Sequence, residues 1–143
     1  MIKTLIFALS LLGLAACSAQ PPFTTPNASL TNTYWKLVEL EHQPAALGAE
    51  GKELSMVLHT ENNRINGFSG CNRFMGTYAL SGHTLKISTL ASTRKMCIEH
   101  PAQEDRFLQI LSQSQHFEIQ GNRLVLKNEI GSPLLSFIAV DLQ

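Results

Sequence analysis

The sequence has few of the residues from which reactive sites are built. The 143-residue chain holds three cysteines and one tryptophan, and 15% of its residues are charged. It contains no Cys-x-x-Cys or His-x-x-x-His spacing, the close ligand pairs typical of zinc sites. Its histidines lie in no recognisable cysteine-hydrolase signature. No glycine-rich loop opens a helix, which excludes a phosphate site of the P-loop or Rossmann kind. We therefore expect no enzyme, no metal and no cofactor.

Net charge is also lacking. The formal net charge is +0, and no basic stripe is visible. A near-neutral chain has no electrostatic reason to bind nucleic acid, so we expect no nucleic-acid partner. What is present is a hydrophobic content of 44% in a chain whose length suits a single globular domain. The oligomeric state stays open.

Residues 1–16 carry the features of a secretory signal. Lys3 is followed by an apolar run over residues 5–14 and then by small residues. The run is too short to span a bilayer, which needs ~20 apolar residues. A buried amino-terminal helix is the alternative.

The end of this segment, Leu-Ala-Ala-Cys at residues 14–17, resembles the bacterial lipobox. The resemblance implies that Cys17 is lipidated and becomes the first residue of the mature chain, and acyl chains give stable membrane anchoring. Ser18, where an Asp would imply inner-membrane retention, implies an outer-membrane protein that faces the periplasm. Residues 17–32 are uncharged and rich in Pro, Ser, Thr and Asn, which favours a lipidated tether. The folded domain is then expected over residues 33–143.

Short alternating segments separated by turn residues predict a mainly β domain. Pro101 suits the first turn of a helix over residues 101–113, Glu104 and Asp105 suit its positive end, and Phe107 and Leu111 share an apolar face. We expect an antiparallel meander that forms a small barrel or barrel-like sheet, with this one helix packed against it. The strands are expected over residues 34–41, 54–60, 64–68, 73–80, 84–88, 116–120, 123–127 and 134–140.

Residues 66–78, NGFSGCNRFMGTY, are the most distinctive stretch of the chain. Their glycines predict a strand, a tight corner and a second strand, with Gly70 and Gly76 holding backbone geometry that a side chain would spoil. Asn66, Asn72 and Arg73 could form a polar ligand or partner site near this corner. The alternative is that the asparagine side chains satisfy backbone groups of a tight loop.

Four other residues have two interpretations each. Trp35 could be a platform for ligand stacking or part of the core. Cys71 and Cys97 could form a disulfide in an oxidising compartment or remain buried apolar thiols. Arg94, next to Lys95, could belong to a small basic surface that touches lipid headgroups or a partner.

The corner and the segments after it together resemble one family. Gly-Cys-Asn-Arg-Phe-x-Gly-x-Tyr at residues 70–78, Thr-Arg-Lys-Met-Cys at residues 93–97, and Glu104, Phe107 and Leu111 are similar to the META domain family, which includes the heat-shock protein HslJ. Met96 stands where the family usually has a small residue. The resemblance runs from about residue 32 to the carboxyl terminus and implies the same barrel with one helix.

The resemblance also implies a role in heat-shock or envelope stress, with links to antibiotic tolerance, motility and virulence in the wider family. The first hypothesis is thus an outer-membrane-anchored periplasmic lipoprotein that binds an envelope protein partner without catalysis. The second is a barrel that carries a small ligand or lipid in its interior. A barrel interior filled by side chains would count against the second hypothesis.

Overall fold

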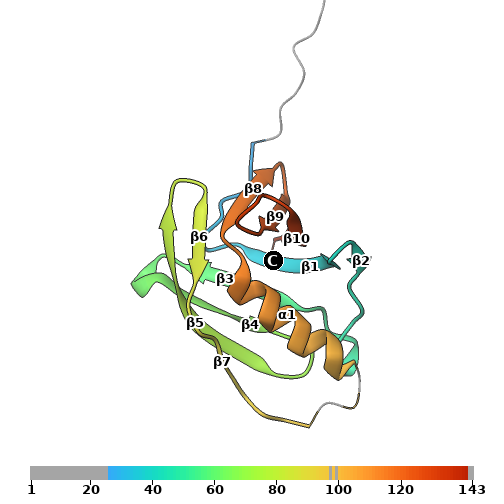
Figure 1. The fold of residues 1–143 in the computed structure, drawn as a ribbon. Helices are drawn as coiled ribbons and strands as arrows, with labels where there is room; N and C mark the ends of the chain where they lie inside the picture. Colours follow the sequence, from blue (N-terminus) through green and yellow to red (C-terminus); the bar gives the residue numbers. More distant parts are fainter. Residues whose placement is uncertain (1–25, 97, 99, 142–143) are drawn as a thin grey trace, which may run out of the picture.

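The computed structural model describes residues 26–96, 98 and 100–141 (Figure 1). The signal segment, Cys17 and Cys97 lie outside the described residues. The strands are β1 (Tyr34–Leu40), β2 (Gln43–Pro44), β3 (Ser55–His59), β4 (Arg64–Phe68), β5 (Arg73–Ser81), β6 (Thr84–Ile87), β7 (Ala91–Ser92), β8 (His116–Gln120), β9 (Arg123–Lys127) and β10 (Pro133–Val140). The helices are the α-helix α1 (Pro101–Gln113) and the 3₁₀ turns η1 (Ala49–Gly51) and η2 (Glu61–Asn63).

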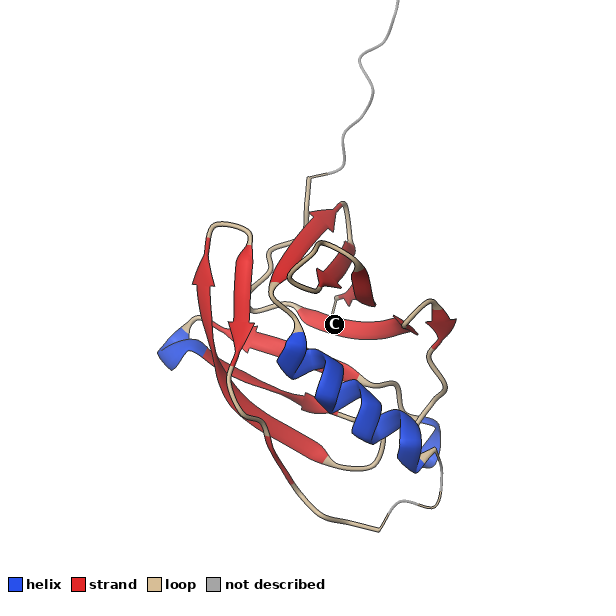
Figure 2. Ribbon diagram, viewed as in Figure 1, coloured by secondary structure: helices blue, strands red, loops and turns tan. Residues whose placement is uncertain are grey.

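Antiparallel pairing closes the sheet into a barrel. The described strands follow the order β10-β9-β8-β6-β5-β4-β3-β1, and β1 pairs with β10 to complete the circle. The short strands β2 and β7 pair with β1 and β5 outside this circle. The predicted antiparallel barrel with one packed helix is therefore confirmed, and Figure 2 shows that helix lying across one end of it.

The barrel is weakest between β6 and β8, where the only residue pair in the described register is Thr84 with His116. In the chain, α1 lies between β6 and β8, and its carboxyl end meets the start of β8 while its body crosses one end of the barrel (Figure 1). Phe107 of α1 inserts between Phe74 of β5 and Phe137 of β10, with ring centroids 5.8 and 6.4 Å away. The helix thus completes the core instead of lying on a finished barrel.

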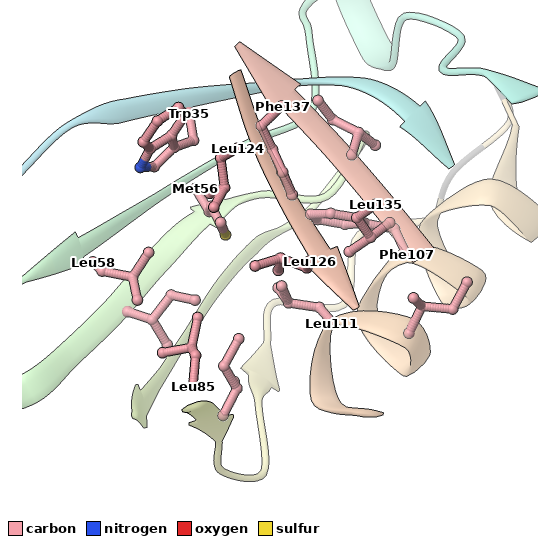
Figure 3. Packing of buried hydrophobic residues seen from close by; sticks show 14 of the residues in the cluster. Trp35, Met56, Leu58, Leu85, Phe107, Leu111, Leu124, Leu126, Leu135 and Phe137 are labelled. Atoms are coloured by element: carbon pink, nitrogen blue, oxygen red, sulfur yellow. The ribbon is translucent and has the colours of Figure 1, made fainter. Parts of the chain in front are cut away.

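The core follows from alternation along the strands. In β1, Trp35 and Leu37 are buried, while the alternate residues Tyr34 and Lys36 are partly exposed. Side chains from both halves of the chain fill the interior, as Figure 3 shows. The indole Nε1 of Trp35 donates to the carbonyl oxygen of Leu30 at 2.9 Å. Trp35, which is 0% exposed, is therefore a core residue and not a stacking platform.

Residues 27–30, which were predicted as part of a tether that extends to residue 32, make contacts with the domain. Leu30 is buried, the amide of Ala28 donates to the carbonyl oxygen of Gly121 at 2.8 Å, and the side chain of Asn27 accepts from the amide of Gly121 at 2.7 Å. The polar composition of this segment suggested a tether. Its polar groups instead bond to the β8–β9 turn, a contact that composition does not reveal. The contacts of the domain therefore include residues 27–30.

The predicted helix bounds are confirmed, and the main strand bounds differ from prediction by no more than one residue. The two-residue strands β2 and β7 were not among the strands expected from the sequence. A strand of two residues is too short to show alternation, and its pairing partner is distant in sequence.

Candidate functional site

The corner between β4 and β5 is held by a buried carboxylate from α1. Glu104 is 7% exposed, and its Oε1 accepts from the hydroxyl of Ser69 at 2.5 Å and from the backbone amide of Asn72 at 3.1 Å. Its Oε2 accepts from the side-chain Nδ2 of Asn72 at 3.3 Å. Hydrogen bonds to charged groups are among the stronger ones in proteins. Glu104 therefore fixes the corner to the helix, in addition to its favourable place in the first helical turn.

The side chain of Asn72 holds a second segment. Its Oδ1 accepts from the amide of Lys95 at 2.7 Å and from the hydroxyl of Thr93 at 2.9 Å. Its Nδ2 donates to the carbonyl oxygen of Lys95 at 3.3 Å. Asn72 thus satisfies backbone groups of the segment after β7, a structural role that reaches beyond its own loop.

The third segment at the corner is the turn η1, which packs on it backbone to backbone. Gly70 has a φ of +123°, a conformation that favours glycine, as predicted. A Cβ on Gly48 would lie 2.0 Å from the carbonyl oxygen of Gly70, and the amide of Ala49 donates to that same oxygen at 2.6 Å. Gly76, by contrast, does not have positive φ, and the space for its side chain is occupied by Leu90.

These three segments form the walls of an open groove on the outer face of β3, β4 and β5. The groove has a volume of about 910 Å³. Its floor comes from outward-facing strand residues, chiefly Val57, Phe68 and Met75. One wall comes from residues 49, 50, 52 and 53, and the other comes from Cys71, Thr93, Lys95 and Met96. We call this feature the outer groove.

The strand register places four side chains of the outer groove in a square. Asn66 pairs with Met75, and Phe68 pairs with Arg73, across β4 and β5. Residues paired across antiparallel strands project to the same face. The two polar side chains therefore occupy one diagonal of the square, and the two apolar side chains occupy the other.

The charges at the rim largely compensate one another. Lys52 forms an ion pair with Glu50, and the hydrogen bond from Lys52 and the nearby charges of Lys52 and Lys95 lower the pKa of Glu50 below its ordinary value. The hydroxyl of Tyr34 donates to Glu53 at 3.4 Å.

The structure thus separates the four residues predicted as a ligand or partner surface. Asn66 and Arg73 are exposed and line the outer groove. Asn72 is buried beneath it. Arg94 is exposed but is not among the residues that line the groove.

Sequence reasoning did not predict that Glu104 and η1 hold the corner between β4 and β5. Glu104 lies three residues before Phe107 and seven before Leu111, so its carboxylate falls on the apolar face of the helix. That position was a signal of burial. No comparable signal marked Gly48.

Large described side chains fill the barrel interior. Trp35 and Phe137 from the strands and Phe107 from α1 are each 0% exposed. A second, shallower depression of about 440 Å³ lies between α1 and the segment after β6, and is lined by Ile87, Leu90 and Leu108 among others.

Among the described residues, no three His, Cys, Asp or Glu side chains gather as a metal site would require. No helix in the described ranges has both the length and the apolar character needed to cross a bilayer.

Comparisons with solved structures agree with this fold. An NMR structure of a protein from Burkholderia xenovorans is similar to 79% of the chain and is covered over 85% of its own length, with 29% identity and a TM-score of 0.64. A crystal structure of a DUF4847 family protein from Bacteroides vulgatus is similar over 80% of the chain and 96% of its own length, with 13% identity and a TM-score of 0.57. The latter likeness concerns the fold alone. No curated protein matches the chain.

A sequence family accounts for the corner, the helix and the closed barrel together. The META domain matches residues 28–141, a range that includes Ala28 and its contact with Gly121. The match covers nearly all of the described residues. The chain belongs to the META domain family.

Proposed function

We infer that this chain is an outer-membrane-anchored periplasmic lipoprotein with a non-enzymatic binding role, and that the outer groove is its binding surface. The observation that carries the proposal is the combination of a filled barrel interior with an exposed, partly apolar groove on the sheet. An exposed apolar surface rimmed by polar residues is characteristic of interaction sites. The family resemblance supports a role in envelope stress or maintenance, as in HslJ-like proteins.

The position of the chain's entry into the domain fits this proposal. Residues 27 and 28 bond to the β8–β9 turn. The segment after β7, one wall of the outer groove, lies at the opposite end of the domain (Figure 1). A domain anchored through Cys17 by residues 17–26 would present the outer groove away from its membrane.

The anchoring is tested by replacing Cys17 with Ala. The variant should leave the membrane fraction or accumulate unprocessed, because the thiol is where the acyl group would attach. The mature mass of the parent measured by mass spectrometry should correspond to an acylated chain beginning at Cys17. An unchanged mass and unchanged fractionation of the variant would contradict the anchor.

The binding role is tested by photo-cross-linking in intact cells. A photoreactive benzoylphenylalanine at position 75, in the groove floor, should capture an envelope protein. The same residue at position 79 is the matched control, because Ala79 is exposed on the same strand but lies outside the groove. Equal capture from both positions, or none from position 75, would contradict the assignment of the groove.

We also propose a disulfide between Cys71 and Cys97. In support, the Sγ of Cys71 lies 3.9 Å from the carbonyl oxygen of Lys95, two residues before Cys97, and a bridge closing a loop of this length is worth about 3 kcal/mol on the chain-entropy model. Thiol labelling of the periplasmic protein under denaturing, non-reducing conditions should find neither thiol reactive. Two reactive thiols would exclude the bridge.

A further inference from the structure

We propose that the outer groove binds an extended, apolar peptide segment that carries one acidic side chain, which is held by Arg73 and Asn66. This inference rests on the proposed binding role and names the chemistry of the partner. It follows from the floor of the groove, from the charges along its rim and from its open shape.

The floor is apolar and adaptable. Val57, Phe68 and Met75 face outward from three adjacent strands, and Met96 adds a second methionine from the wall. Met75 is 63% exposed and Met96 is 93% exposed. Methionine side chains are unbranched and polarisable, and they pack against apolar groups of different shapes. Such a floor suits the apolar side chains of a peptide without demanding one particular sequence.

The charges of the outer groove indicate where an acidic group would bind. Glu50 is compensated by Lys52 and Lys95, and Glu53 accepts from Tyr34. The guanidinium of Arg73 forms no ion pair with any residue in the described ranges. The groove therefore offers a cation that a ligand's carboxylate can pair with.

Asn66 is placed to assist Arg73. The two residues are diagonal neighbours on the same outer face of β4 and β5, a separation of about 7–8 Å that long side chains can bridge. A carboxylate above Phe68 and Met75 can accept from the guanidinium of Arg73 and from the side-chain amide of Asn66. The apolar diagonal then holds the neighbouring side chains of the same ligand.

The open shape favours a peptide over an acyl chain. An acyl chain in an open groove would leave much of its apolar surface in contact with water, which is unfavourable in proportion to the exposed area. An extended peptide turns alternate side chains toward the groove, where apolar groups meet the floor and the acidic group meets Arg73, and it leaves the intervening polar side chains facing solvent. The barrel interior is filled by buried side chains of the described residues, which leaves the open groove as the surface considered for an acyl chain.

The test measures the anisotropy of two labelled peptides against the mature lipoprotein in lipid nanodiscs, with empty nanodiscs as the blank. Both are acetylated and amidated heptapeptides of alternating threonine and leucine that begin and end with threonine. The central residue, which shares the leucine face, is glutamate in one peptide and glutamine in the other. The glutamate peptide should bind about tenfold more tightly, the scale of a charge-assisted hydrogen bond. Arg73→Gln should abolish this difference. Arg64→Gln should preserve it, because Arg64 is exposed on the same face of β4 but lies outside the groove.

Equal binding of the two peptides, no binding of either, or an equal loss in both arginine variants would overturn the proposal. Competition by octanoate that depends on Arg73, with no peptide binding, would assign the site to a fatty-acid anion and overturn the peptide. Met75→Ala should weaken both peptides, and circular dichroism establishes that each variant is folded. Capture of an envelope protein from position 75 without peptide binding would reject this chemistry while leaving the proposed binding role intact.

Discussion

The two sides of the segment from Asn66 to Tyr78 each carry an asparagine, but their roles are opposite. On the buried side, the polar side chains of Ser69 and Asn72 bond to α1 and to the segment after β7, and the ring of Phe74 packs against Phe107 of α1. The outer side contains Asn66 and Arg73, which face the outer groove. Two asparagines in one short stretch thus differ completely in role. The difference shows that strand direction and corner geometry, more than residue type, decide which polar group is structural.

The largest expected effect comes from removing the carboxylate beneath the corner. Glu104→Ala leaves the buried hydroxyl of Ser69 and the amide of Asn72 without this acceptor, so we expect a loss of about 3 kcal/mol or more in the free energy of unfolding. Urea denaturation measures the loss. Asp105→Ala is the matched control, because Asp105 is the exposed neighbour on the same helix. Similar unfolding midpoints for the two variants would remove the distinction between buried and outer sides.

The next effect comes from the contact between η1 and the corner. Gly48→Ala places a methyl group against the carbonyl of Gly70 and forces the backbone to shift, so we expect a loss of about 2 kcal/mol. Gly82→Asn is the control. Gly82 has positive φ, which asparagine tolerates, and a Cβ there meets nothing within 4 Å. Unfolding curves of the two variants that overlay would show that the close approach is not required.

A smaller effect is expected at the ion pair between α1 and the end of β1. The Nε of Arg106 donates to Glu41 at 2.8 Å, and this hydrogen bond is the main cause that lowers the pKa of Glu41 below its ordinary value of 4.5. Both side chains are more than a third exposed, so Arg106→Gln should cost no more than about 1 kcal/mol near neutral pH.

The same ion pair has a predictable pH dependence. Because the pKa of Glu41 is lowered in the folded state, its stabilisation is present above pH 4.5 and is lost as the pH falls below that value. The stability difference between the parent and Arg106→Gln should therefore shrink in acid, as urea titrations at several pH values would show. A double variant with Glu41→Gln should lose no more than either single variant. A difference that is constant with pH would exclude this pairing.

The smallest stability effects are expected in the outer groove itself. Met75→Ala and Arg73→Gln should each change the free energy of unfolding by no more than about 0.5 kcal/mol, because both side chains are exposed. Thermal unfolding checks this. A loss comparable to that of Glu104→Ala would mean that the outer side is structural as well, and would weaken its assignment as a binding surface.

Much of the fold was predictable because its signals are local. Alternation located the main strands, and Pro101 with the apolar spacing of Phe107 and Leu111 located the helix. The glycine at position 70 indicated a backbone conformation that other residues rarely adopt. Each of these signals depends on neighbours within a few residues, which the sequence displays directly.

What only the tertiary structure decided depends on contacts between distant segments. The pairing of β1 with β10 closes the barrel, and the packing of η1 on the corner requires Gly48 to lie beside Gly70. Leu30 became part of the core because Trp35 and the β8–β9 turn order a segment whose composition alone suggests a tether. The sequence by itself determined the elements and the corner, because propensity and period act locally. The buried role of Asn72 and the exposure of Arg73 were decided by where those elements meet.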